Sequence, residues 1–293
     1  MPNAIELAKS YVPLLDEVYR LASCTAVLDG APELVRQGAN ANELVIPKLS
    51  MQGLADYSRN SGYVNGDVTL TYETVKCNYD RGRMFTVDSM DDLETAGTAF
   101  GRLAGEFIRT KVTPELDAFR FATYSGISGI SKVSSGMTFA TGDEVIKEIR
   151  TGATKMDEDE VPADQRYLFI TPTLNGMIQD LETYKSRAVL ENFAQVITVP
   201  QTRFYTAIDQ YDGTTASEKE GGYIKDKSNG KNINFMIIHK PAVIQFEKHV
   251  VPKIIEPEAN QDADAYKFGY RHLGIAEAYD NKVAGIYLHY ATT

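Results

Sequence analysis

Hydrophobic and polar residues alternate over residues 68–75, where valine, leucine and tyrosine stand among threonines. Such alternation of β-branched and aromatic residues with polar ones predicts a half-buried β-strand. The turn signal Asn65-Gly66 precedes the strand, and strand character resumes over 84–87. This part of the chain therefore predicts a long, largely exposed β-ribbon. Because a long unpaired ribbon is a liability in a monomer, we expect it to dock on a neighbouring molecule.

Hydrophobic residues at spacings of three and four predict a long helix over residues 88–125. Ser89 can cap its start, followed by acidic residues that suit the helix dipole. Thr113-Pro114-Glu115 indicates a kink or a second start, because proline breaks a helix interior but tolerates a first turn. The apolar stripe consists of Leu93, Ala96, Phe100, Leu103 and Phe107.

Residues 1–43 have few apolar positions for their length. A helical spacing of leucine and valine over 14–21 predicts a helix, and Gly30-Ala31-Pro32 interrupts the pattern. Two interpretations stay open here: an ordinary N-terminal helix packed on its own core, or an arm that lies on another molecule.

The remainder of the chain has a mixed α/β pattern, so the predicted fold class is α+β. Two loops stand out, an acidic one over 156–162 and a long polar one over 209–232, which is functional or mobile by its length. The predicted helices are 143–150 and 174–181, and the predicted strands are 167–170, 196–199, 234–238, an antiparallel pair over 247–276 turning at 257–262, and 283–290.

Composition and charge exclude several classes of protein. The 293 residues include 30 Lys and Arg against 40 Asp and Glu, a formal net charge of −10. This balance argues against a protein whose main task is to grip phosphates. Two cysteines cannot form a disulfide framework, and the sequence contains neither a signal peptide pattern nor an apolar run near the ~20 residues of a membrane span. A cytoplasm-like, reducing setting is expected.

No motif in the sequence predicts a metal, a cofactor or a catalytic centre. The spacing of a helical zinc site, a Cys-x-x-Cys pair and a nucleotide-binding glycine loop are all missing. Cys77 is a nucleophile only if a histidine lies near it in space. The four histidines are His239, His249, His272 and His289.

Three other groups have a simpler interpretation than a ligand site. Residues 157–160 are acidic but lack the alternation and the glycine of a calcium loop, so we expect a solvated loop. Asp262 and Asp264 flank a turn, where a turn cap or an ion pair is expected. The glycines over 126–136 indicate a linker between two folded parts.

Arg81 and Arg83 flank Gly82 at the end of the ribbon. An arginine guanidinium at such a position can bind phosphate or a carboxylate. Because the ribbon is expected to be exposed, we expect the partner to be a carboxylate of a neighbouring subunit.

The order of these segments resembles the major capsid (coat) protein of tailed bacteriophages, with its Hong Kong phage-type coat fold. The resemblance covers nearly the whole chain. It is carried by Leu44-Val45-Ile46-Pro47, Asp80-Arg81-Gly82-Arg83, Phe85-Thr86-Val87-Asp88, Pro114-Glu115-Leu116-Asp117-Ala118, residues 233–240, Asp264-Ala265-Tyr266-Lys267-Phe268 and residues 281–287.

The resemblance implies a division of the chain. Residues 1–43 would form the N-terminal arm and lead into the peripheral domain, and 44–86 an extended β-hairpin loop laid over the next subunit. The peripheral domain, with a long spine helix and a β-pair, would comprise 87–125 and 246–276. The axial α/β domain, with the polar loop 209–232, would comprise 126–245 and 277–293.

The function implied is structural: hexamers and pentamers forming the icosahedral or prolate head of a tailed phage or prophage around double-stranded DNA. No catalytic residue and no cofactor is expected. If Met1 is the native start, a separate scaffolding protein is implied, besides a portal protein. An encapsulin-like cellular compartment and a cytosolic α/β enzyme with a scattered site stay open as alternatives. The expected subunit-interface residues are Arg59, Tyr63, Tyr72, Lys76, Arg81 and Arg83.

Overall fold

The computed structural model describes residues 23–30, 36–37, 43–60, 62–90, 98–181 and 188–292. The predicted helix over 14–21 lies outside these residues, as do the acidic positions Asp91 and Asp92 and the first part of the apolar stripe, Leu93 and Ala96.

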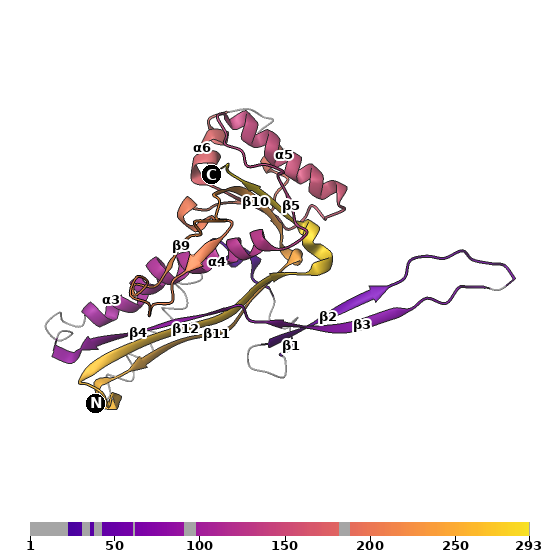
Figure 1. Ribbon diagram of the computed structural model, residues 1–293. Helices are drawn as coiled ribbons and strands as arrows, with labels where there is room; N and C mark the ends of the chain where they lie inside the picture. Colours follow the sequence, from indigo (N-terminus) through magenta and orange to yellow (C-terminus); the bar gives the residue numbers. More distant parts are fainter. Residues whose placement is uncertain are drawn as a thin grey trace.

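A five-stranded sheet forms the centre of the molecule, and helices α5 and α6 lie against one of its faces (Figure 1). All seven residues of its middle strand, β10, are buried. Phe235 and Ile237 pack with the residues of α5, whereas Met236 and Ile238 pack with Phe121 of α4. A strand covered on both faces needs a continuous apolar run, which is what the sequence has here. The strand order is β5 (Ser131–Lys132), β13 (Ile286–Tyr290), β10 (Ile233–His239), β6 (Arg166–Ile170) and β7 (Gln195–Thr198), and the helices are α5 (Gly142–Glu158) and α6 (Pro172–Gln179).

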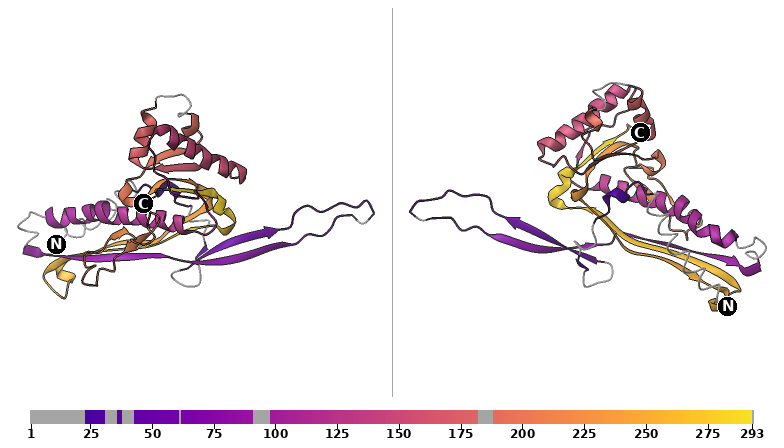
Figure 2. Two further views of the ribbon diagram at one scale, coloured as in Figure 1. Left: turned by 45° about the horizontal axis from the view of Figure 1, so that its top comes forward. Right: turned by 180° about the vertical axis from the view of Figure 1, so that it is seen from behind.

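A three-stranded sheet extends from this centre, and one long helical rod lies along it in both views of Figure 2. The rod contacts the inner face of the sheet through Ile108 and Leu116, which pack with Phe268 and Tyr270. At Ile108–Val112 the rod has a π-helical turn, so Pro114 stands at the start of α4 as a second start rather than in a helix interior. The strand order is β11 (Val243–Ile255), β12 (Ala265–Ala278) and β4 (Tyr79–Asp88), and the rod comprises α3 (Thr98–Phe107), the π turn η3 (Ile108–Val112) and α4 (Thr113–Gly126).

The β2–β3 hairpin projects from the body as a two-stranded ribbon (Figure 1). It is built from β2 (Glu43–Met51) and β3 (Val68–Lys76), with β1 (Arg36–Gln37) paired to the base of β2. The ribbon is shorter than the 44–86 expected from sequence, because the chain leaves it after Lys76 and β4 pairs with β12 instead. Phe85 explains the difference: in β4 its ring lies 4.8 Å from that of Phe107 on the helical rod, a contact that the ribbon could not offer.

Several local predictions need correction. The Ser89 hydroxyl donates to a carboxylate oxygen of Asp264 at 2.7 Å, and the first turn of the helix that it was expected to cap lies mostly outside the described residues. The acidic loop 156–162 is in part helical, since α5 continues to Glu158 to bury Met156. The glycine-rich stretch 126–136 is more than a linker, because β5 adds to β13 as a parallel strand. The ion pair predicted near the turn is present, with Asp262 2.5 Å from Lys267.

The polar loop 209–232 contains a small hairpin of its own, β8 (Ile208–Gln210) and β9 (Tyr223–Lys225). Within the described residues no helix is long and apolar enough to cross a membrane. The remaining elements are short 3-10 turns: η1 (Ala26–Leu28), η4 (Gln201–Arg203), η5 (Lys240–Ala242), η6 (Pro257–Ala259) and η7 (Asp280–Gly285).

Candidate assembly surface

Exposed hydrophobic side chains concentrate on the β2–β3 hairpin. Of the thirteen large hydrophobic side chains that are exposed in the described part of the chain, nine lie between residues 49 and 72. A contiguous exposed apolar patch marks an interaction site, whereas single exposed residues need no explanation. The nine are Leu49, Met51, Leu54, Tyr57, Tyr63, Val64, Val68, Leu70 and Tyr72.

The register of the hairpin sorts these side chains onto one face. Leu49 stands opposite Leu70, and Met51 stands opposite Val68. Tyr72 follows on the same face, because every second residue of a strand points the same way. The positions between them, including Thr69, are polar. The ribbon is therefore amphipathic, and its apolar face has no cover among the described residues of the same chain.

The tip of the hairpin carries a pair of tyrosines. The rings of Tyr57 and Tyr63 lie 4.9 Å apart at 60°, while Ser58 and Gly62 exchange two backbone hydrogen bonds. Gly62 has φ +78°, a conformation that favours glycine. Tyr63 remains 87% exposed despite its neighbour, so the tip offers a preformed aromatic surface.

Four of the residues expected at a subunit interface lie along this hairpin. Arg59, Tyr63, Tyr72 and Lys76 are all exposed. Their assignment to an interface stays a prediction. The sequence analysis singled out charged and aromatic residues and did not assign Leu49 or Met51 to the surface, although the register of a hairpin places them there.

Arg81 and Arg83 differ from the other four, because both have partners in their own chain. Arg81 Nε lies 2.7 Å from Glu115 Oε1 of α4. Arg83 donates through both terminal nitrogens to the carbonyl oxygens of Lys219 and Glu220, at 2.9 Å each. The carboxylate that Arg81 binds in this structure therefore belongs to its own chain, and the assignment of Arg81 and Arg83 to a subunit interface stays a prediction. Both arginines lie on the inner face of β4, and that face is turned toward α4 and the β8–β9 loop.

The segment 23–30 folds back onto the body, unlike the hairpin. The carboxylate of Asp117, fully buried in α4, accepts bonds from the Ser23 hydroxyl at 2.8 Å, the Cys24 amide at 3.0 Å and the Thr25 hydroxyl at 2.8 Å. It also forms an ion pair of 3.2 Å with Arg203. Burial, together with the nearby Asp117 charge, raises the pKa of the Cys24 thiol to about 11, so this cysteine stays protonated near neutral pH.

Arg120 and Gln245 complete this anchor. Arg120 donates to the Thr25 hydroxyl at 2.8 Å and to Glu247 at 3.1 Å. Gln245 donates to the Thr25 carbonyl and to Asp29, both at 2.7 Å. A buried polar group is costly unless it is paired, so this network fixes the segment 23–30 on α4 and β11. No sequence signal indicated it, since its partners are more than 80 positions apart.

The sequence and the structure were compared with those of known proteins. No protein-family model matches the sequence, and no curated protein does either. Solved structures do match over most of the chain. One of Gordonia phage Cozz has a TM-score of 0.58 at 12% identity, covering 93% of this chain and 87% of the other. The mature capsid of bacteriophage PhiM1 has a TM-score of 0.54 at 11% identity and covers 86% and 82%.

The chain has the fold of phage capsid proteins. The α+β fold class and the resemblance stated from sequence are thereby confirmed. A virus-like particle from Pyrococcus furiosus also has this capsid fold, with a TM-score of 0.55 at 10% identity and coverage of 93% and 98%.

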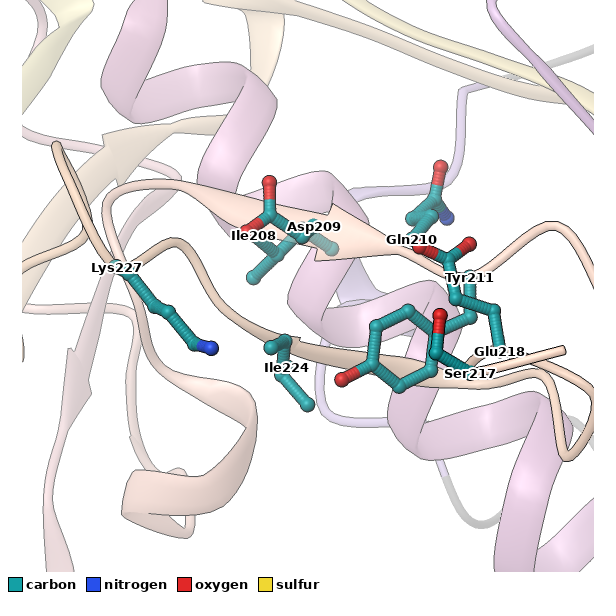
Figure 3. Close-up of a pocket in the computed structure, with 8 residues that line it drawn as sticks. All are labelled: Ile208, Asp209, Gln210, Tyr211, Ser217, Glu218, Ile224 and Lys227. Atoms are coloured by element: carbon teal, nitrogen blue, oxygen red, sulfur yellow. The ribbon is translucent and has the colours of Figure 1, made fainter. Parts of the chain in front are cut away.

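A pocket of about 500 Å³ lies beside the β8–β9 hairpin (Figure 3). Asp209, Glu218 and Lys227 contribute charges to its lining, and Tyr211 an aromatic ring. Among the described residues, no three of His, Cys, Asp and Glu gather as a metal site.

Proposed function

We propose that this protein is a coat subunit, many copies of which assemble through hexamers and pentamers into the closed head of a tailed phage or prophage. The observation that carries the proposal is the amphipathic β2–β3 hairpin. Its apolar face is not covered by any described residue of the same chain, and the chain has the capsid fold. In the assembly the hairpin lies on the next subunit, with Arg59, Tyr63, Tyr72 and Lys76 at the contact. The subunit acts structurally and not as an enzyme.

The partners follow from the same proposal. The shell encloses double-stranded DNA without reading its sequence, and the net charge of −10 suits a wall that must not adhere to a polyanion. A separate scaffolding protein and a portal protein take part in assembly in the host bacterial cytoplasm, and the finished protein resides in the virion.

A cellular compartment shell is the second candidate, because the virus-like particle from Pyrococcus furiosus has a similar fold, although the similar phage capsids favour the phage head over it. Such a shell would use the same hairpin contact but would hold a cargo protein instead of a genome. The contents of purified particles distinguish the two candidates.

The test is electron microscopy of the purified full chain, expressed alone and with its neighbouring reading frames. Closed, uniform particles are expected, and nuclease-protected DNA in particles from the natural source identifies a phage head. A compact monomer or dimer under every condition would contradict the proposal and favour the α/β enzyme.

A shortened hairpin sharpens the test. Replacing residues 52–67 by Asn-Gly leaves β2 and β3 joined by a two-residue turn. The replacement does not reach the three-stranded sheet of β11, β12 and β4, where Tyr79 is buried. We expect this variant to fold with the same thermal stability as the parent and to form no closed particles. Normal particles from it would show that the tip of the hairpin, residues 52–67, does not carry the assembly contact.

A further inference from the structure

The β8–β9 hairpin connects the five-stranded sheet to the long sheet, the three-stranded sheet of β11, β12 and β4. Its stem leads into the five-stranded sheet: the Thr206 amide donates to the Lys231 carbonyl at 2.9 Å, and the amide of Ile233, the first residue of β10, donates to the Phe204 carbonyl. Its far end reaches the long sheet, where it meets β4. The hairpin therefore spans from the middle strand of one sheet to an outer strand of the other.

Arg83 holds the far end of this hairpin. Its two terminal nitrogens bind two consecutive carbonyl oxygens, those of Lys219 and Glu220. Gly221 allows the close approach, because a Cβ at this position would lie 2.7 Å from Arg83 Nη1. The φ of Gly221 is +66°, which also favours glycine. The missing side chain at Gly221 therefore leaves the space that the Arg83 guanidinium occupies.

Arg81 holds the same hairpin two residues earlier on β4. Its guanidinium binds Glu115 of α4 and lies 3.4 Å from the carbonyl oxygen of Gly222. Glu115 in turn accepts from Gln210 of β8 at 3.3 Å. The Glu115 side chain is only 11% exposed, so this part of the contact is sheltered from solvent. Three elements, β4, α4 and the β8–β9 hairpin, meet at this point.

The strand that carries both arginines is the direct continuation of the exposed β2–β3 hairpin. Only Cys77 and Asn78 separate β3 from β4. The Asn78 side chain fixes this junction on β12, donating to the Ala276 carbonyl at 2.7 Å and accepting from its amide at 3.1 Å. Arg81 and Arg83 follow this junction closely on β4, so a change in the position of the junction acts directly on the strand that carries both arginines.

We propose that Arg81 and Arg83 form a clasp on the β8–β9 hairpin that fixes the angle between the long sheet and the five-stranded sheet. Its role in an assembled shell rests on the proposed function. In the shell, the clasp couples the position of the β2–β3 hairpin on the next subunit to the orientation of the five-stranded sheet, and this coupling sets the curvature of the shell. The arginines bind carbonyl oxygens of the backbone, so the contact holds the two sheets at one angle. Because the arginines are partly exposed to solvent, each bond contributes little free energy and the contact can be released.

The clasp is tested with Arg83→Ala and Gly221→Ala in the full chain. Arg109→Ala is the charge-matched control, because Arg109 lies on the helix surface in a pair with Glu106 where both side chains are 58% exposed. Gly176→Ala is the control for the added methyl, because no atom lies within 4 Å of its Cβ position. Backbone amide exchange over residues 211–222 is measured on the subunit, and particle diameters are measured by electron microscopy.

Both clasp variants are expected to exchange these amides about tenfold faster than the parent, the effect of losing charge-assisted bonds to two carbonyls, and to give a broader distribution of diameters. The controls change neither. Unchanged exchange in Arg83→Ala would overturn the clasp. Faster exchange with parental diameters would overturn its role in curvature. If the parent forms no closed particles, the proposed function fails and the curvature role with it, and exchange alone decides whether the clasp exists.

Discussion

The molecule contains two antiparallel ribbons that share a secondary structure and differ in what covers them. The β11–β12 ribbon lies under the helical rod and beside β4, and Phe268 in its middle is fully buried. The β2–β3 ribbon has neither cover, and Leu70 in its middle is 54% exposed. Both have hydrophobic residues at every second position. The comparison teaches that the apolar face of the β2–β3 ribbon has the same need for burial, which none of the described residues of its own chain meets.

The largest expected difference between the ribbons concerns stability. Phe268→Ala removes a ring that contacts Phe85 and Phe107, so we expect it to lower the free energy of unfolding by about 4 kcal/mol. Leu70→Ala in the β2–β3 ribbon is the counterpart, and should change it by less than about 0.5 kcal/mol. Chemical denaturation of the unassembled subunit measures both. Equal losses would mean that the two ribbons are equally covered within one chain.

Acid should also affect the covered ribbon through His272 of β12. Burial, and then the charge of Arg120, lowers the pKa of His272 to about 3, whereas an unfolded histidine titrates near 6.5. Between these values the unfolded chain binds the additional proton, so stability is complete above the unfolded pKa and falls as the pH drops toward 3. From pH 7 to pH 5 the contribution of this group decreases by about 2 kcal/mol.

His272→Gln isolates this contribution. Burial lowers the pKa of His289 to about 4 and lowers the pKa of His239 as well, so the parent loses stability through three histidines. The variant should retain the parts of the slope between pH 7 and pH 5 that come from His289 and His239, measured as the free energy of unfolding in denaturant at each pH. A slope identical to that of the parent would contradict the assignment to His272.

The elements that the sequence predicted well are those whose pattern is local. The continuous apolar runs at 235–238 and 167–170 became parts of the buried strands β10 and β6. The stripe with Leu103 and Phe107 became the helical rod, because helical spacing needs no distant partner to be recognised.

What the sequence could not predict depends on distant pairing. Residues 84–87 look like a strand whether they pair with β3 or with β12, and the contacts that favour β12 are distant in sequence, such as that of Phe85 with the helical rod and that of Asn78 with Ala276. The carboxylate that Arg81 binds, Glu115, lies 34 positions away and on a helix. Charge and exposure of an arginine indicate that it has a partner, but only the fold determines whether that partner belongs to the same chain.

The smallest change in stability should accompany the largest change in assembly. Leu70→Asp places a charge on the apolar face of the β2–β3 ribbon, and Thr69→Asp places the same charge on the polar face one residue away. Because both positions are exposed in the subunit, each variant should unfold within about 0.5 kcal/mol of the parent. An interface that buries the apolar face excludes an unpaired carboxylate, whose desolvation is costly. Light scattering and electron microscopy should therefore find no closed particles from Leu70→Asp and normal particles from Thr69→Asp. Particles from both variants would show that the apolar face stays in solvent, and loss of both would place the contact on the edge of the ribbon rather than on that face.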